Sequence, residues 1–178
     1  VSKRGDDETS ALYVIPVDGG EAEEILEMPF ALASPKWLPD GQHLIVGTSV
    51  IAELAGTFAK TNLAAMKKEV KRRKDSKMTA KVTEDRQYRF FDKYLTDNLA
   101  TRLLRVNVAT KEVKDLTPGY GRWFQPDGGV SYDLSPDGSQ LVLAMNSTLP
   151  PYREFPNGDL YLVPTDGSGK LKNLTAEN

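Results

Sequence analysis

The chain has no cysteine, a single histidine and almost no net charge. The lack of cysteine excludes disulfides, thiolate catalysis and cysteine-ligated zinc. Its 23 Lys and Arg residues nearly balance its 25 Asp and Glu residues, and the net charge of -2 gives no overall attraction to nucleic acid or anionic lipid. Every apolar run is far shorter than the roughly 18–20 residues of a membrane helix. We therefore expect neither nucleic acid nor a membrane as a partner.

The start of the sequence does not have the pattern of a signal peptide. The first ten residues, VSKRGDDETS, are polar from the second residue onwards and contain no apolar stretch after a basic start. The chain does not begin with Met, so we expect a mature or excised piece, and a leader upstream of it stays open. The localisation therefore stays unknown, with cytoplasm and periplasm both open.

The composition that remains is that of a globular chain. Its 178 residues are 39% hydrophobic and 27% charged, which suits one ordinary domain or two small ones rather than a disordered segment. Three stretches resemble one another, each with an apolar strand, a turn rich in Gly, Asp, Thr or Lys, and a short strand that closes on Leu or Leu-Thr. They are ALYVIPVDGGEAEEIL (11–26), RLLRVNVATKEVKDLT (102–117) and DLYLVPTDGSGKLKNLT (159–175).

Two further hairpins lie between these repeats, and both have Pro-Asp-Gly at the tip. They are SPKWLPDGQHLIVGT (34–48) and VSYDLSPDGSQLVLAM (130–145). Proline presets φ near −65° in such a turn, and glycine accepts the positive φ that follows. The strand after each turn is continuously apolar, which is typical of a strand covered on both faces.

Hairpin, linker and hairpin make a unit of four short antiparallel strands, which is the pattern of a β-propeller blade. The predicted fold class is all-β: a partial β-propeller of about two and a half four-stranded antiparallel blades with a helical insertion. We expect an outer half-blade at 1–26, a blade at 34–117 with an insertion at 51–97, and a complete blade at 130–175. A closed propeller usually has at least four blades, so residues 1–178 are expected to be a fragment of a propeller domain. Its open blade edges predict self-association of the isolated fragment.

The insertion departs from the repeat. Leu63, Met66 and Val70 have helical spacing and predict a helix over Leu63–Lys74, with Thr61 or Asn62 as its N-cap. The aromatic stretch QYRFFDKYLTD (87–97) predicts a strand near 88–94 or a structured loop. Its Phe90, Phe91 and Tyr94 suit the core, the lining of a central channel or an interface.

The residues that suggest chemistry each have a plainer interpretation. His43 follows a turn on a strand, which favours a surface strand residue, and one histidine without cysteine makes a zinc site improbable. No G-x-S-x-G elbow is present, so the chain is interpreted as non-catalytic. Asp18, Asp40, Asp137 and Asp166 each stand alone beside a turn glycine, which favours turn chemistry over calcium binding.

Two charged clusters are interpreted in the same way. Glu21, Glu23 and Glu24 are expected on a solvated strand face, although paired glutamates bind a peptide amino terminus in dipeptidyl peptidases. The basic run KKEVKRRK (67–74) is expected to be the solvent face of an amphipathic helix, because no aromatic residues that could stack on bases interleave with it. No catalytic, cofactor-binding or metal-binding residue is predicted, and no cofactor.

The order of these motifs resembles the propeller half of the prolyl oligopeptidase family. The similarity is carried by the three repeats, the two Pro-Asp-Gly hairpins and the aromatic segment followed by VNVATKEVKDLTPG (106–119). The most similar branch is that of the bacterial acylaminoacyl-peptidase and dipeptidyl-peptidase-like enzymes. The Pro-Asp-Gly repeats are also shared by TolB-like propellers, which leaves a protein-binding scaffold as the alternative.

The resemblance implies a division of labour between two domains. Family members join a propeller to an α/β-hydrolase domain that carries the Ser, Asp and His, and the propeller restricts access so that short peptides reach the serine. The implied partners of the chain are thus peptide substrates and a C-terminal hydrolase domain of the same polypeptide. No triad motif of the family occurs in residues 1–178, so no catalytic residue is carried over.

Overall fold

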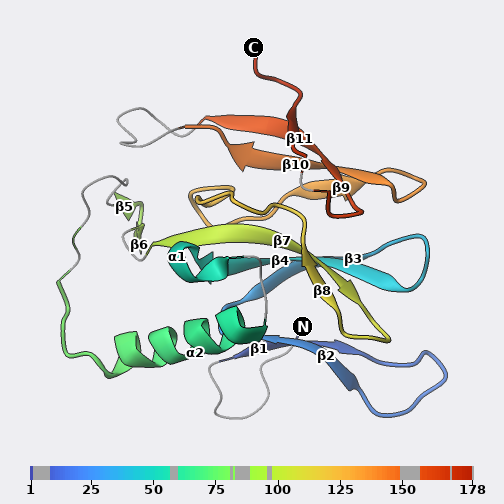
Figure 1. Cartoon of the computed structure of the whole chain (residues 1–178), viewed down its shortest axis with the longest axis horizontal. Helices are drawn as coiled ribbons and strands as arrows, with labels where there is room; N and C mark the ends of the chain where they lie inside the picture. The colour runs from blue at the N-terminus through green and yellow to red at the C-terminus, as the bar shows by residue number, and fades with distance from the viewer. Residues whose placement is uncertain are drawn as a thin grey trace.

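Three antiparallel sheets form the blades and follow one another along the chain, and a small two-stranded sheet lies in the insertion (Figure 1). The computed structural model describes residues 1, 9–56, 60–80, 82, 89–95, 98–148, 157–168 and 170–177. The first sheet contains β1 (Ser10–Val14) and β2 (Glu23–Met28). The second and the third sheet each contain four strands, which pair in the order in which they occur along the chain. Two and a half propeller blades are therefore present, as predicted.

The strands of the two complete blades alternate with tight turns. In the second blade they are β3 (Leu32–Trp37), β4 (His43–Ile51), β7 (Leu99–Asn107) and β8 (Val113–Asp115). In the third blade they are β9 (Tyr132–Leu134), β10 (Gln140–Asn146), β11 (Gly158–Pro164) and β12 (Lys172–Asn173). The central pair β4–β7 runs without a register shift from His43 opposite Asn107 to Ile51 opposite Leu99.

Both hairpins with Pro-Asp-Gly at the tip form the predicted turns. The Gly41 amide donates to the Leu38 carbonyl at 3.1 Å, and the Gly138 amide donates to the Ser135 carbonyl at 2.9 Å. Gly138 has φ of +70°, and a Cβ there would lie 2.5 Å from Pro39 Cδ. The tips of neighbouring blades therefore touch, and glycine is needed at Gly138 for both its conformation and its size.

The apolar side chains form two layers, one on each face of the second blade. Along β4, Leu44 and Val46 face the half-blade, whereas Ile45 faces the third blade, as the period of a strand requires. The layer on the half-blade side also contains Leu12, Ile25, Leu26, Met28, Leu104 and Val106. The layer on the other side also contains Leu38, Leu103, Leu116, Phe124, Leu141, Leu143 and Met145. Each blade thus covers a face that its neighbour cannot bury alone.

The insertion contains two helices and a small hairpin. These are α1 (Ala52–Ala55), α2 (Lys60–Asp75), and the strands β5 (Arg89–Phe90) and β6 (Lys93–Tyr94). The predicted helix is confirmed and extends further at both ends. Met66 is fully buried in the half-blade layer, and Leu63 and Val70 pack against the same layer. The predicted N-caps are wrong, because Thr61 and Asn62 lie inside α2; the Asn62 amide donates to the Leu54 carbonyl at 2.9 Å.

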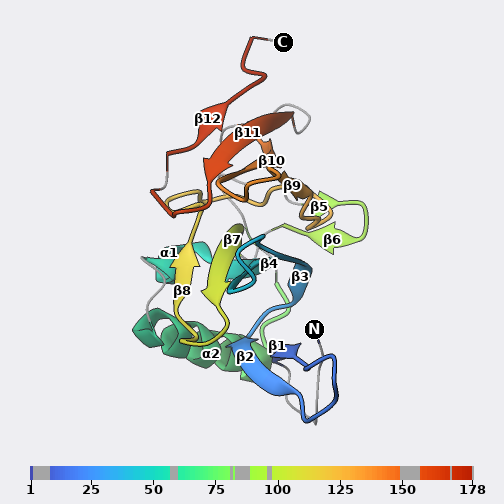
Figure 2. The same ribbon diagram turned by 90° about the vertical axis from the view of Figure 1, so that its right-hand side faces the viewer.

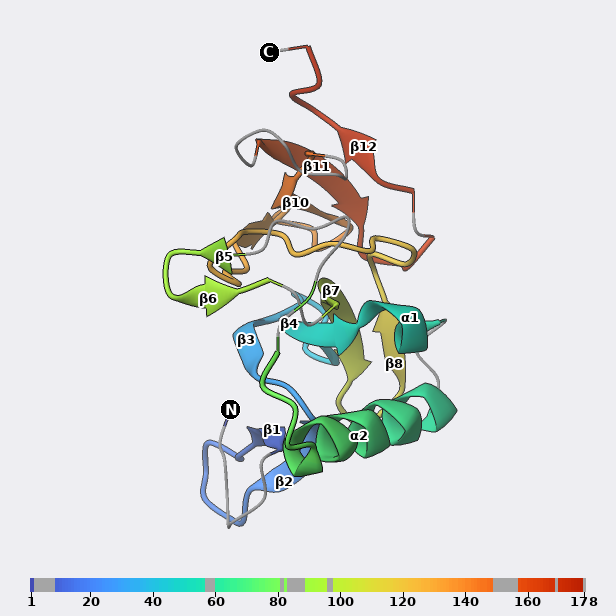
Figure 3. The ribbon, with the colours of Figure 1, turned by 90° about the vertical axis from the view of Figure 1, so that its left-hand side faces the viewer.

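The two ends of the blades differ. Figure 1 shows the insertion at the left-hand end and the Pro-Asp-Gly turns at the right-hand end. In Figures 2 and 3 the inner strand β3 and the hairpin β5–β6 lie on one side, and the outer strands β8 and β12 lie on the other. In a propeller, the inner strands surround the central channel. Within the described residues no helix has the length and apolar character to cross a bilayer.

Candidate functional site

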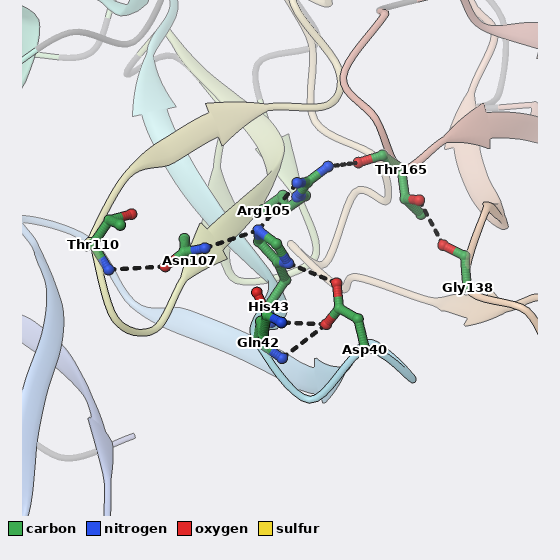
Figure 4. Close-up of polar contacts among 8 residues, drawn as sticks. All are labelled: Asp40, Gln42, His43, Arg105, Asn107, Thr110, Gly138 and Thr165. Atoms are coloured by element: carbon green, nitrogen blue, oxygen red, sulfur yellow. Dashed lines mark hydrogen bonds and ion pairs between the residues drawn. The ribbon is translucent and has the colours of Figure 1, made fainter.

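His43 lies at the junction of the second and third blades (Figure 4). Its Nδ1 is 2.6 Å from Asp40 Oδ2, and its Nε2 is 3.0 Å from Arg105 Nη2 and 3.1 Å from Asn107 Nδ2. Arginine and the amide nitrogen can only donate, so Nε2 accepts and Nδ1 carries the proton. The side chain is only 15% exposed, so the prediction of a surface position is wrong, although His43 does begin strand β4.

The same network crosses between the blades. Arg105 Nη1 donates to the Thr165 carbonyl at 2.9 Å, and the Thr165 hydroxyl donates to the Gly138 carbonyl at 2.5 Å. Figure 4 shows the bonds running from the Asp40 turn through His43 and Arg105 into the third blade. Each of the described partners of His43, Asp40, Arg105 and Asn107, holds the ring in place, so its geometry is that of a structural link.

Three of the four turn aspartates, Asp40, Asp137 and Asp166, accept hydrogen bonds from nearby amides. Asp40 Oδ1 accepts from the amides of Gln42 and His43 at 2.8 and 3.0 Å. Burial acts to raise the pKa of Asp40, but these bonds and the His43 contact lower it further than burial raises it. Asp137 accepts from Ser139 N and Asp166 from Ser168 N. In the described part of the chain, no three His, Cys, Asp or Glu side chains gather as metal ligands would.

The two charged clusters lie on exposed surfaces. Glu21, Glu23 and Glu24 are exposed; Glu23 pairs with Lys111 at 3.0 Å and Glu24 accepts from the Tyr13 hydroxyl at 3.2 Å. The basic run lies on α2, where Glu69 bonds to Arg72 at 2.7 Å and to Arg73 at 2.8 Å. Lys67 reaches Glu27 on β2 at 2.5 Å, which ties the helix to the half-blade.

One ion pair is almost completely buried within the second blade. Arg102 Nε lies 3.1 Å from Asp115 Oδ2, and the side chains are 3% and 4% exposed. The geometry of this contact is not that of a hydrogen bond, although Asp115 Oδ1 accepts from the Thr117 amide at 2.8 Å. Burial raises the pKa of Asp115 and lowers that of Arg102, since desolvation disfavours both charges. The sequence interpretation did not identify this pair.

A pocket of about 410 Å³ opens at the insertion end of the second blade. Its wall comes from the end of β4, the start of β7, the residues around β6 and the connection from β8 to β9. The lining residues are Ser49, Tyr94, Leu95, Leu99, Ala100, Thr101, Trp123, Pro126, Asp127 and Gly128.

The rim of this pocket contains a third Pro-Asp-Gly sequence, at residues 126–128. The Gly128 amide donates to the Gln125 carbonyl at 2.9 Å, and Asp127 Oδ1 accepts from the Gly129 amide at 2.8 Å. The local chemistry is that of the two hairpin tips, but this turn lies at the opposite end of the blades. The sequence interpretation missed it, although a search for the tripeptide alone would have found it.

The aromatic segment forms the hairpin beside this pocket. Phe91 is 81% exposed and stacks edge-on against Phe90 with ring centroids 4.7 Å apart, and Tyr94 lines the pocket. A core position for Phe91 is therefore wrong. Gln87, Tyr88, Thr96 and Asp97 lie outside the described residues, so the predicted strand near 88–94 is observed only as β5 and β6.

Comparisons with known proteins can be set against this geometry. No protein-family model matches the chain. It is 28% identical over 142 residues to the uncharacterized peptidase YuxL of Bacillus subtilis strain 168, a match that covers 79% of this chain and 19% of that protein.

Two solved structures have a similar fold. The acylaminoacyl peptidase of Pyrococcus horikoshii, in its orthorhombic crystal form, has a TM-score of 0.54 at 14% identity. An acylaminoacyl peptidase in complex with Z-Gly-Gly-Phe-chloromethyl ketone has a TM-score of 0.54 at 15% identity. Each match covers 94% of this chain and 21% of the other, so the chain spans about a fifth of the length of these proteins. With its repeats, its blades and these matches, the chain is similar to the propeller portion of acylaminoacyl-peptidase-like members of the prolyl oligopeptidase family.

Proposed function

We propose that the chain is a non-catalytic segment of the propeller of a serine peptidase. In this proposal it restricts the access of peptides to a Ser-Asp-His hydrolase domain in another part of the same polypeptide. The similarity to a Bacillus peptidase and to acylaminoacyl peptidase structures supports this role. The absence of a nucleophile elbow from residues 1–178 is consistent with a role in access rather than in chemistry.

The observation that carries the proposal is the position of the hairpin β5–β6. It lies on the side of the inner strands and at the insertion end, beside the pocket (Figures 2 and 3). Phe91 at its tip has φ of +50°, a left-handed conformation that costs a non-glycine residue about 1–2 kcal/mol. A strained, exposed phenylalanine in a hairpin that borders a pocket is the kind of feature that function retains at the expense of stability.

The proposal is tested on the full-length protein with a fluorophosphonate probe and a series of peptides of increasing length. We expect the probe to label one serine outside this chain and short peptides to be hydrolysed. Phe91→Gly relieves the backbone strain and removes the ring, so we expect kcat/KM for long peptides to change relative to short ones by about 3-fold or more. A protein that neither reacts with the probe nor hydrolyses peptides would instead support a TolB-like scaffold.

The control for this experiment is Val17→Gly. Val17 is a fully exposed apolar residue in the turn between β1 and β2, at the other end of the blades. Deletion of α2 is a less informative variant, because it would also remove Met66 from the core. If Phe91→Gly and Val17→Gly leave the same length preference, the hairpin has no part in access.

A further inference from the structure

The four methionines of the chain lie in two contrasting environments. Met28 and Met66 are 0% exposed and Met145 is 1% exposed, and all three belong to the buried apolar layers. Met78, in contrast, is 75% exposed. The flexible thioether of methionine normally fills gaps in a hydrophobic core, so an exposed position departs from its ordinary use. Met78 therefore presents the one methionine sulfur of this chain that a dissolved reactant reaches without any opening of the fold.

Met78 follows the end of α2, on the segment that leads toward β5. Figure 1 shows this segment at the left-hand edge of the molecule. The Ser76 amide donates to the Arg73 carbonyl at 3.3 Å, and the Met78 amide donates to the Ser76 hydroxyl at 3.2 Å. These two bonds hold the backbone and leave the thioether in contact with solvent.

The side chain of Met78 also lines a groove beside α2 with a volume of about 460 Å³. A water molecule occupies about 30 Å³ in the liquid, and hydrogen peroxide is only slightly larger, so the groove is wide enough to admit it. The sulfur is thus accessible both from the surface and from the groove.

We propose that Met78 is a peroxide-reactive modification site, which is oxidised to the sulfoxide while the other three methionines of the chain remain thioethers. In this step the sulfur attacks one oxygen of hydrogen peroxide, so that an S–O bond forms as the O–O bond breaks. The sulfur loses two electrons, and the second oxygen leaves as water after a proton shift. Methionine sulfoxide reductases reverse the change, one enzyme for each sulfoxide epimer.

The position of Met78 determines what the sulfoxide does to the fold. A sulfoxide at Met66 would place a polar oxygen in an apolar layer, where no water can solvate it. The sulfoxide oxygen at Met78 is solvated by water, so the chain keeps its fold and the modified side chain stays accessible to a reductase. The inference concerns a site apart from the proposed role in peptide access and does not depend on it.

The experiment uses the full-length protein, treated with increasing hydrogen peroxide, quenched, digested with trypsin and analysed by mass spectrometry. Trypsin releases Met66 in TNLAAMK (61–67) and Met78 in MTAK (78–81), so the two residues are compared within one digest. We expect the Met78 sulfoxide to form at least about 10-fold faster than the Met66 sulfoxide, because the buried sulfur reacts only after local opening. In concentrated urea the two rates should become equal. The two reductases, added to the folded oxidised protein, should restore the Met78 thioether.

The matched variants are Met78→Leu and Met66→Leu, which make the same change at the exposed and at the buried position. Met78→Leu should abolish the fast sulfoxide and keep the melting temperature within about 2 °C, whereas Met66→Leu should leave the Met78 rate unchanged. Equal rates for Met78 and Met66 in the folded protein would overturn the inference. So would a Met78 sulfoxide that the reductases leave in place, or a fall in melting temperature on oxidation that Met78→Leu prevents.

Discussion

Gly47 on β4 lies directly against Val130, in the segment that leads into the third blade. A Cβ at this position would be 2.7 Å from Val130 Cγ2 and 2.8 Å from Val130 Cγ1, well inside normal contact. We expect Gly47→Ala to force the blades apart and to destabilise the chain by about 1–3 kcal/mol. The measurement is urea unfolding followed by circular dichroism. The double variant Gly47→Ala with Val130→Ala should recover most of the loss, and a failure to do so would place the strain elsewhere.

Asp137 provides a test of pH dependence. The bond from the Ser135 hydroxyl, followed by those from Ser139, lowers its pKa to about 2 from the ordinary 3.8. A carboxylate with a lowered folded pKa contributes stability that is complete above 3.8 and is lost as the pH falls through about 2. Asp137→Asn lacks this charge. We expect its melting temperature to lie below that of the unmodified chain by a constant gap at neutral pH, and the gap to close between pH 4 and pH 2.

The control for this pH series is Asp18→Asn. Asp18 lies in the turn between β1 and β2, and among the residues that the structure describes no amide donates to its carboxylate. At neutral pH its variant should melt at the same temperature as the unmodified chain. A gap for Asp137→Asn that is the same at pH 2 and pH 7 would contradict the assigned role of the carboxylate charge.

Strands and turns were the elements most accessible to prediction, because their signals are local. Proline and glycine at the hairpin tips determine the turns, and the apolar strands after them have the length of strands buried on both faces. Leu63, Met66 and Val70 identified the helix by their spacing. Its start was misplaced, because Thr61 and Asn62 belong to residue types that often cap helices but here lie inside α2.

The candidate site was less accessible, because it depends on contacts between distant residues. His43 meets Arg105 across 62 positions, and Tyr94 joins Trp123 and Asp127 in one pocket. The third Pro-Asp-Gly, at residues 126–128, has the same letters as the hairpin tips yet lies at the other end of the blades. Its place follows from the path of the β8–β9 connection, which no local pattern encodes.

The link through His43 gives a prediction about how two blades are joined. His43→Leu removes the acceptor shared by Arg105 and Asn107. The Arg105 guanidinium, which also donates to the Thr165 carbonyl, then loses its hydrogen bond to the ring. We expect a loss of about 1–2 kcal/mol, since two half-buried donor groups lose their shared acceptor. Hydrogen exchange should rise in the turn around Thr165 as well as around His43. Exchange that rises only around His43 would show that the link does not reach the third blade.

At the scale of the molecule, each blade depends on the next. The third blade buries Leu141, Leu143 and Met145 against the second, whereas Leu160 on its other face is 43% exposed. In the half-blade, β1 pairs with β2 alone among the described strands. An open strand edge and a partly exposed blade face are the surfaces through which propeller blades normally meet their neighbours.

We therefore expect the isolated 178-residue chain to associate with itself. Light scattering over a range of concentrations should give a mass that rises above that of the monomer, 19.7 kDa. Leu160→Lys places a charge on the exposed blade face and should lower the association, whereas Lys172→Arg on the same sheet keeps the charge and should not. Circular dichroism confirms that both variants keep their strands. A chain that stays monomeric at the highest concentration would mean that its blade edges are already satisfied, and the expected dependence on neighbouring blades would then be wrong.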